Sequence, residues 1–391
     1  MKKHLIFFLL ITASITLKAQ NYRIGHLTRT MTDPSRNRLI PVEIYYPADS
    51  DGNNVPFTQQ PITAPIVTFG HGFVMTWDAY VNVWNALVSH GYVIAFPTTE
   101  SGFSPVHLEM GKDLAFLVTA LQAEGVTPAS PLYGRLDSAA CVMGHSMGGG
   151  ASFLAVQFNS SIRTMVNFAA AETTPSAIAA ASGIVIPSLV FSGGNDCVTP
   201  PAAHQIPMYD SLASSCKTYI SMVGASHCQF ADPNTLCSFG EATCTPAAAI
   251  SRTDQHDVMN RYMIPWLDFH LKGDCAAGAT FDSLLVIDSQ INYQRTCQLC
   301  PAPTSVAALQ PLTWSIGPNP VRDHLTIFFD EASVGRLEVC NMAGATIFSQ
   351  IILEGSHSAE VFLNGLPAGT YLVRYYSPFL PVSTRTFMKQ D

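Results

Sequence analysis

A serine stands between two glycines in the segment GHSMGGG, residues 144–150, directly after the apolar run AACVM. A serine hydroxyl is a weak nucleophile at its ordinary pKa, so it needs a nearby base and an acid that orients the base. Where this pattern is catalytic, the serine lies on a tight turn between a strand and a helix, and the glycines leave room for neighbouring backbone. Residues 148–158 read as the helix that would follow. Ser146 is therefore a candidate nucleophile; the alternative is a small residue in a glycine-rich loop.

The candidate acid follows a later apolar run. Residues 187–201, PSLVFSGGNDCVTPP, read as a strand that breaks at Gly-Gly-Asn-Asp. On a strand-turn-helix nucleophile site the partners follow in the order serine, acid, histidine, each at the end of a later strand. Asp196 occupies the position of the acid. The alternative is a turn-forming aspartate, with Asn195 or Glu172 as the fallback acid.

The candidate base comes after the next apolar run. Residues 218–230, TYISMVGASHCQF, read as a strand that His227 follows directly. Because a neutral imidazole is the usual general base near neutral pH, we predict that His227 activates Ser146. The chain holds 12 histidines. Two others in this half, His204 and His256, read as surface or helix residues.

An oxyanion hole requires two backbone N–H groups directed at the reacting oxygen. Met147, the residue after the nucleophile, is expected to give one, and the loop TFGHGF at residues 68–73 the other. Gly70 and Gly72 would let this loop approach the serine, so Phe73 is the expected second donor. The alternative is an ordinary glycine turn. Phe73 is also a candidate substrate-binding residue, unless it is a core phenylalanine.

These candidates lie in a regular alternation of apolar runs and helix-like stretches. The expected strands cover residues 39–48, 64–69, 92–97, 139–144, 164–169, 187–193 and 218–224, and the expected helices residues 79–91, 110–125, 148–158 and 254–273. Continuous apolar character is typical of strands buried on both faces, and the alternation predicts a mostly parallel sheet flanked by helices. We therefore predict the α/β-hydrolase fold over residues 20–300.

The pattern changes after residue 300. Residues 301–312, PAPTSVAALQPL, read as an uncharged linker that contains proline. Short strand-like segments separated by Gly, Asn and Pro follow it. They predict an all-β module over residues 313–391, a small sandwich.

Composition and the first residues indicate export. Residues 1–19, from a basic start through an apolar stretch to LKA, read as a secretory signal peptide. The alternative is a membrane anchor, for which the apolar stretch is short, and no later segment predicts a transmembrane helix. The net charge of −8 and the absence of a dense basic block argue against a nucleic-acid partner.

The ten cysteines fit an exported chain. Eight lie between Cys197 and Cys300, and an even cluster in an exported protein favours disulfides. Connectivity cannot be deduced, but close neighbours such as Cys237 with Cys244, and Cys197 with Cys216, are candidate pairs. Cys141 is expected to be a buried free thiol. The rival interpretation is a zinc site of His227, Cys228, Cys237 and Cys244, although this spacing fits no standard zinc pattern.

Residues 60–272 resemble cutinase-like polyester hydrolases and the related dienelactone-hydrolase and chlorophyllase-type esterases. The resemblance lies in VMGHSMGGG at residues 142–150 and in the stretch from residue 202 to the Gly-Ala-Ser-His ending at His227. PVEIYYPA at residues 41–48 is also similar to platelet-activating-factor acetylhydrolases. The resemblance implies an ester hydrolase without a cofactor, with Ser146, Asp196 and His227 as its triad and Phe73 and Met147 at the oxyanion hole.

Two features depart from that family. Polyester hydrolases usually carry a tryptophan after the strand that follows the nucleophile helix, and residues 167–177, NFAAAETTPSA, have none. The segment HCQFADPNTLCSFGEATC, residues 227–244, looks like an insertion that contains cysteines. Both features bear on polymer hydrolysis and leave ester hydrolysis as the expectation. In the loop of residues 98–107, Phe103 and His107 are candidates for a wall of the substrate site.

The last eighty residues resemble the C-terminal sorting domain of type IX secretion. The resemblance lies in SIGPNPVRDHLTI, VCNMAGATIF, GLPAGTYLVRYY and the ending TRTFMKQD. It implies translocation across the outer membrane by the type IX machinery and a secreted or cell-surface location. The rival interpretation is a sandwich that binds carbohydrate or a surface.

We therefore expect an exported serine carboxylester hydrolase that acts through an acyl-enzyme, on polyester, lipid or other esters. A short-chain or acetylhydrolase-like esterase and an acyltransferase or peptidase would use the same triad. A non-catalytic surface-binding module on the same fold is the alternative of another class.

Overall fold

The computed structural model describes residues 22–300, 314–342, 344–376 and 382–390. The chain folds as two compact units, one ending at Cys300 and the other beginning at Pro301. The signal peptide expected at residues 1–19 and the linker expected at residues 301–312 lie outside the described residues.

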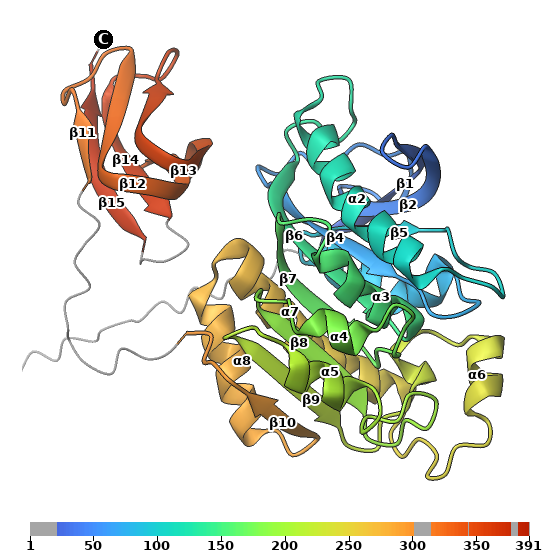
Figure 1. The fold of residues 1–391 in the computed structure, drawn as a ribbon. Coiled ribbons are helices and arrows are strands. Elements are labelled where there is room, and N and C mark those ends of the chain that lie inside the picture. Colours follow the sequence, from blue (N-terminus) through green and yellow to red (C-terminus); the bar gives the residue numbers. More distant parts are fainter. Residues whose placement is uncertain (1–21, 301–313, 343, 377–381, 391) are drawn as a thin grey trace, which may run out of the picture. The chain divides into compact units, whose positions relative to one another are not determined.

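A ten-stranded sheet forms the centre of the first unit (Figure 1). Its strand order is β10-β9-β8-β7-β6-β4-β5-β2-β1-β3, and the six strands from β9 to β5 are parallel. The parallel strands are β4 (Ala64–Gly70), β5 (Val93–Pro97), β6 (Leu136–His145), β7 (Ile162–Phe168), β8 (Ser188–Gly193) and β9 (Lys217–Met222). The flanking strands are β1 (Arg23–Asp33), β2 (Arg38–Ala48), β3 (Gly52–Asn53) and β10 (Ile291–Arg295). The predicted α/β-hydrolase fold is confirmed.

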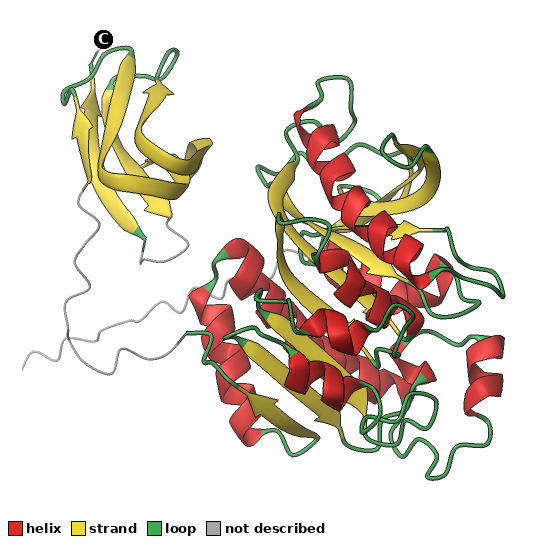
Figure 2. Ribbon diagram, viewed as in Figure 1, coloured by secondary structure: helices red, strands yellow, loops and turns green. Residues whose placement is uncertain are grey.

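Helices cover both faces of this sheet (Figure 2). One core contains side chains of α1 (Val81–Ser89), α7 (Arg252–Lys272) and α8 (Cys275–Ile287). The other contains side chains of α2 (His107–Val126), α3 (Met147–Val156), α4 (Ala177–Ala181) and α5 (Gln205–Ser211). Successive strand residues alternate between the two cores: Val67 and Phe69 enter the first, and Ala64 and Ile66 the second. Each parallel strand is therefore apolar at nearly every position, as its sequence indicates.

The helix α7 ends where its sequence predicts. Ser251 and Asp254 form a capping box at its start, and Gly273 ends it with a left-handed φ of 70°. The helix runs through Pro265 without interruption. None of the helices within the described ranges is long and apolar enough to span a membrane.

Four disulfides lie in the first unit, and their pairing differs from the candidate pairs. The bonds join Cys197 to Cys244, Cys216 to Cys297, Cys228 to Cys237 and Cys275 to Cys300. The candidate pairs Cys237–Cys244 and Cys197–Cys216 are wrong because the fold, and not sequence distance, brings cysteines together. Cys141 is a buried free cysteine on β6, as expected.

The C-terminal unit is the all-β module that the sequence predicts, with longer strands. Its strands are β11 (Trp314–Gly317), β12 (His324–Asn341), β13 (Thr346–Phe362), β14 (Gly369–Tyr376) and β15 (Ser383–Lys389). All the ladders among these five strands are antiparallel. β12 and β13 each join two of the expected short strands. β12 pairs with β11 in its first half and with β14 in its second, and register shifts near Ser333 and Gly335 separate the halves.

Candidate active site

Ser146 lies on a strained turn between β6 and α3. Its backbone angles are φ 55° and ψ −121°, which a residue with a Cβ rarely adopts. Three backbone hydrogen bonds hold the turn. The N–H of Ser146 donates to the carbonyl of Phe168 at 2.9 Å, and its own carbonyl accepts from the N–H groups of Gly150 and Ala171. The surrounding sheet therefore fixes the conformation that directs the serine side chain out of the turn.

Close backbone contacts require glycine at two positions of this turn. A Cβ at Gly144 would lie 2.3 Å from the carbonyl oxygen of Gly148, and a Cβ at Gly148 would lie 2.1 Å from that of Gly70. Since backbone atoms cannot move aside easily, larger residues are excluded at both positions. The second contact also shows that the loop after β4 packs directly on the first turn of α3.

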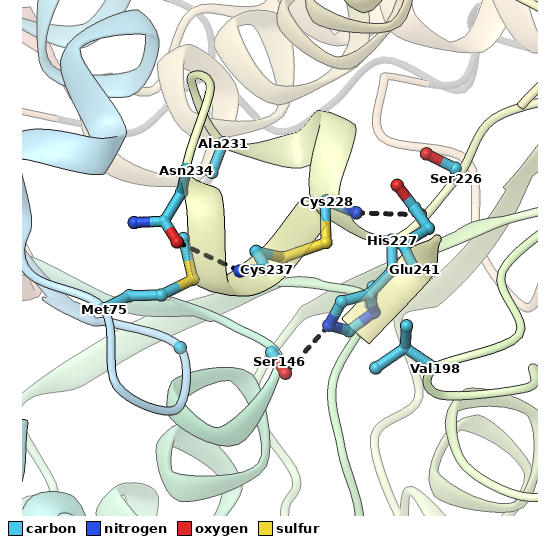
Figure 3. The surroundings of a disulfide bond; sticks show 12 residues. Met75, Ser146, Val198, Ser226, His227, Cys228, Ala231, Asn234, Cys237 and Glu241 are labelled. Carbon is cyan, nitrogen blue, oxygen red and sulfur yellow. Dashed lines mark hydrogen bonds between the residues drawn. A yellow bond between two sulfur atoms is a disulfide. The ribbon is translucent and has the colours of Figure 1, made fainter. Parts of the chain in front are cut away.

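His227 reaches the serine from the end of β9. Its Nε2 lies 2.9 Å from Ser146 Oγ, and its Nδ1 lies 2.8 Å from Asp196 Oδ2 (Figure 3 shows the first of these bonds). An ionised carboxylate can only accept, so Nδ1 carries the ring proton and Nε2 accepts the hydroxyl hydrogen of Ser146. All three side chains are almost completely buried. The structure thus brings together the three residues that the sequence singles out.

Asp196 is held in place by its own turn after β8. Its Oδ1 accepts the N–H groups of Val198 and Thr199, both at 2.8 Å. The Thr199 hydroxyl lies 2.8 Å from Asp196 Oδ2 and 3.0 Å from His227 Nδ1, and it accepts a hydrogen bond from Gln205 Nε2. These contacts orient the carboxylate of Asp196 toward the histidine.

The other candidate acids and histidines are engaged elsewhere. Asn195 Nδ2 donates to the carbonyl of Ala247, and Glu172 Oε2 accepts the N–H of Ile178. His204 Nδ1 accepts the N–H of Glu172. His256 lies on α7.

The two expected oxyanion donors lie on segments that pack together. Met147 is the first residue of α3, and Phe73 follows the β4 loop that contacts Gly148. The role of their N–H groups stays a prediction. The Phe73 side chain is 46% exposed, so it is not a core residue. It forms an edge-to-face pair with Phe103, which is 80% exposed, at 6.3 Å between ring centroids.

Two disulfides attach the segment after His227 to the rest of the first unit. It contains the short helices η2 (Cys228–Phe230) and α6 (Thr235–Glu241). The Cys228–Cys237 disulfide begins at the residue after His227, as Figure 3 shows, and the Cys197–Cys244 disulfide begins at the residue after Asp196. These bonds occupy the cysteines of the rival zinc interpretation.

Sequence analysis missed three residues that contact this site. Thr199 is recognisable only in part, since Asp196 is a turn-forming residue type and Thr199 lies in the turn that follows it. Tyr80 and His145 gave no such signal, because their side chains meet across 65 residues of sequence and His145 meets the carbonyl of His227 across 82. His107, a candidate for the substrate wall, begins α2 and accepts the N–H of Thr174 through Nδ1.

Two family models match this chain. Residues 40–276, more than half of the chain, match the family model described as PET hydrolase-like. Residues 315–385 match the model of the secretion system C-terminal sorting domain.

Similar curated proteins align with about half of the chain. Cutinase 1 of Thermobifida cellulosilytica is 27% identical over 197 residues, which cover 49% of this chain and 67% of that protein. A cutinase of Thermobifida fusca is 27% identical over 197 residues, 49% of this chain and 58% of that protein. The bis(hydroxyethyl) terephthalate hydrolase of Streptomyces coelicolor is 30% identical over 196 residues, 49% of this chain and 56% of that protein. The chain thus spans between about half and two thirds of the length of these relatives.

Proposed function

The chain belongs to the PET hydrolase-like family, and on this premise we propose that it is an exported serine hydrolase of carboxylic esters. The observation that carries the proposal is the continuous hydrogen-bonded line from Ser146 Oγ through the His227 ring to Asp196. The names of the similar proteins, cutinases and a hydrolase of bis(hydroxyethyl) terephthalate, support ester chemistry.

In the proposed reaction, Ser146 Oγ attacks the ester carbonyl while His227 Nε2 takes the hydroxyl proton. The bond from carbonyl carbon to the alcohol oxygen then breaks, and the imidazolium returns that proton to the leaving alkoxide. Asp196 stabilises the imidazolium and keeps the ring in the tautomer whose Nε2 is free to accept. Water, activated by the same histidine, then hydrolyses the acyl-enzyme.

The developing oxyanion is the charge that needs most stabilisation. We assign this role to the N–H groups of Met147 and Phe73. The start of α3 supports the assignment, because a helix N-terminus carries partial positive charge. No step of this mechanism requires a cofactor.

The substrate is an uncharged carboxylic ester, and polyester and lipid esters both fit this class. The exposed Phe73 and Phe103 rings support an apolar acyl or alcohol group. No tryptophan occurs in residues 167–177, so an aromatic wall of the usual family kind is not available there.

The C-terminal unit is a secretion-system sorting domain, so the protein is exported to the cell surface or the medium. We propose that its partner there is the type IX machinery, because the strand motifs of this unit resemble the sorting domains which that machinery exports.

Turnover of p-nitrophenyl esters with acyl chains from C2 to C16, and of bis(hydroxyethyl) terephthalate, tests the proposal. Ser146→Ala should lower kcat by at least about 10³-fold. Ser89→Ala, at the last residue of α1, should have the kcat of the wild type. The chain-length profile separates a short-chain esterase from a lipase or polyester hydrolase. If the folded wild type is inert on every ester, the non-catalytic surface-binding alternative replaces this proposal. If turnover needs an added alcohol or amine, the protein is an acyltransferase.

A further inference from the structure

We propose that Tyr80 and His145 are positioning residues that tie the oxyanion loop to the catalytic histidine through one buried hydrogen-bond chain. The inference rests on the proposed function, since it concerns how that site holds its geometry. Neither residue contacts Ser146 Oγ in the structure, so neither is a catalytic residue.

The hydrogen-bond chain joins residues of four separate segments. The N–H of Gly72, in the loop after β4, donates to Tyr80 Oη at 2.8 Å. Tyr80 Oη lies 3.0 Å from His145 Nδ1, and His145 Nε2 lies 3.1 Å from the carbonyl oxygen of His227. The hydrogen-bond chain thus ends at Gly72, the residue before Phe73, and at the backbone of His227, the proposed base.

Only one direction of donation satisfies every group in the chain. The carbonyl of His227 can only accept, so His145 Nε2 carries the ring proton. Burial lowers the pKa of His145 well below its ordinary value, so the ring is neutral and Nδ1 accepts from the hydroxyl of Tyr80. The Tyr80 oxygen then accepts the N–H of Gly72. Met75 Sδ also lies 3.5 Å from Tyr80 Oη, but sulfur is a weak acceptor and does not compete with an imidazole nitrogen.

Packing leaves these rings little freedom. Tyr80 and His145 are fully buried, and the Tyr80 ring lies against Phe69 at 4.7 Å between centroids. The His145 ring lies 4.8 Å from the His227 ring. A shift at either end of the chain would leave a buried polar atom without its partner, which is costly. Gly72, the residue before the proposed oxyanion donor Phe73, and the backbone of His227 are therefore held at one mutual distance.

This arrangement matters because catalytic groups must be placed within a fraction of an ångström. If the chain only satisfied polar groups in the core, its removal would lower stability and leave the chemical step unchanged. If it positions the site, its removal will slow the step in which the oxyanion forms and leave ground-state binding unchanged.

Tyr80→Phe is the main test, because it removes one hydroxyl and keeps the ring. We expect kcat on p-nitrophenyl esters to fall about 10- to 100-fold with KM within about twofold. A boronic acid, which forms a tetrahedral adduct with Ser146, should bind more weakly by a similar factor. The matched control is Tyr92→Phe, since Tyr92 is equally buried and its hydroxyl donates to Asp268 at 2.6 Å, outside the chain. This control should lose stability and keep kcat.

The double variant tests whether the two residues act as one unit. His145→Leu should lower kcat at least as much as Tyr80→Phe, and the double variant should be no slower than His145→Leu alone. Additive losses, or a Tyr80→Phe variant whose kcat stays within about twofold of the wild type, would overturn the proposal.

An NMR arm separates this proposal from the proposed function. We expect ¹⁵N spectra of the wild type to show His145 as the Nε2–H tautomer, and Tyr80→Phe to shift the ring signals of His227 while Tyr92→Phe leaves them in place. A wild type that is inert on all esters would contradict the ester function. The positioning proposal would then be tested by these His227 signals alone. Unchanged His227 signals in Tyr80→Phe would overturn it.

Discussion

Several groups besides His227 contact the carboxylate of Asp196. Two backbone N–H groups occupy Oδ1, and the Thr199 hydroxyl lies 2.8 Å from Oδ2. A hydrogen bond to a charged acceptor contributes about 1.5–3 kcal/mol, which is enough to affect the orientation of the triad. Thr199 therefore extends the site beyond the three side chains that exchange or stabilise the proton.

Thr199→Val should lower kcat/KM about tenfold, because the side chain keeps its shape but loses the hydroxyl that faces Asp196 and His227. Ester turnover measures the effect. Thr218→Val is the matched control, since the Thr218 hydroxyl is buried on β9 with no hydrogen-bond partner among the described residues. Equal losses in both variants would show that the effect is one of packing alone.

His270 makes the stability of the fold depend on pH. Burial lowers its pKa to about 3, and its ring lies 4.3 Å from Trp266. In the unfolded chain a histidine takes up a proton near pH 6.5. Between about pH 6.5 and pH 3 the unfolded state binds a proton on this histidine and the folded state does not. The free energy of unfolding therefore falls as the pH decreases through this range.

Removing this titration should flatten the pH profile. Between pH 6.5 and pH 5 the wild type should lose up to about 2 kcal/mol more unfolding free energy than His270→Leu. Urea unfolding at pH 8, 6.5 and 5 measures both proteins, and the pH 8 values give the baseline difference from packing. Parallel profiles for the two proteins would contradict the assignment.

The sequence identifies a site residue where the role of that residue depends on its neighbours along the chain. Ser146, Asp196 and His227 each follow an apolar strand and each lie at a turn, so their convergence follows from a parallel sheet. Tyr80 and His145 could not be found this way. Their contacts depend on distances between η1 (Trp77–Tyr80), β6 and the end of β9, which no single stretch of sequence encodes.

At the scale of elements, the segment after His227 is attached beside both Asp196 and His227. Its two disulfides start at Cys228 and Cys197, the residues that follow His227 and Asp196. The helix α6 buries none of its own side chains, so these bonds replace the core packing that would otherwise hold it. The two bonds therefore connect this segment directly to the positions of the acid and the base.

Replacing Cys228 and Cys237 together by serine should therefore lower kcat/KM about tenfold while costing about 2–3 kcal/mol of stability. Replacing Cys275 and Cys300, which join the start of α8 to the end of the first unit, should cost a similar stability and leave kcat/KM unchanged. Denaturant unfolding and ester turnover on both double variants make the comparison. If both pairs reduce activity equally, the segment after His227 has no special role at the triad.

Element type was easier to predict than element pairing. The parallel strands are apolar on both faces, which identifies them, and the alternation with helices gives the sheet. Disulfide partners were not predictable, because Cys216 and Cys297 meet through the pairing of β9 with β10, 81 residues apart. The expected short strands of the second unit were too short because β12 and β13 continue through their bulges.

At the scale of the whole molecule, the two units have separate cores. Among the described residues, the cores on the two faces of the large sheet contain residues up to Leu299, and the core of the second unit contains residues from Trp314 onward. A unit with its own core can fold without its neighbour. Catalysis and export are therefore assigned to different parts of the chain, since the triad lies in the first unit and the sorting domain in the second.

Deleting residues 301–391 should separate the two activities. The truncated protein should keep kcat/KM within about twofold of the full chain, because no described core residue of the first unit is lost. In the native host it should accumulate in the periplasm, where the signal peptide expected at residues 1–19 would deliver it, while the full chain reaches the surface or the medium. Cell fractionation with ester turnover in each fraction measures both effects. A truncated protein that is exported normally would contradict the sorting role, and one that folds but loses turnover would show that the second unit contributes to the catalytic site.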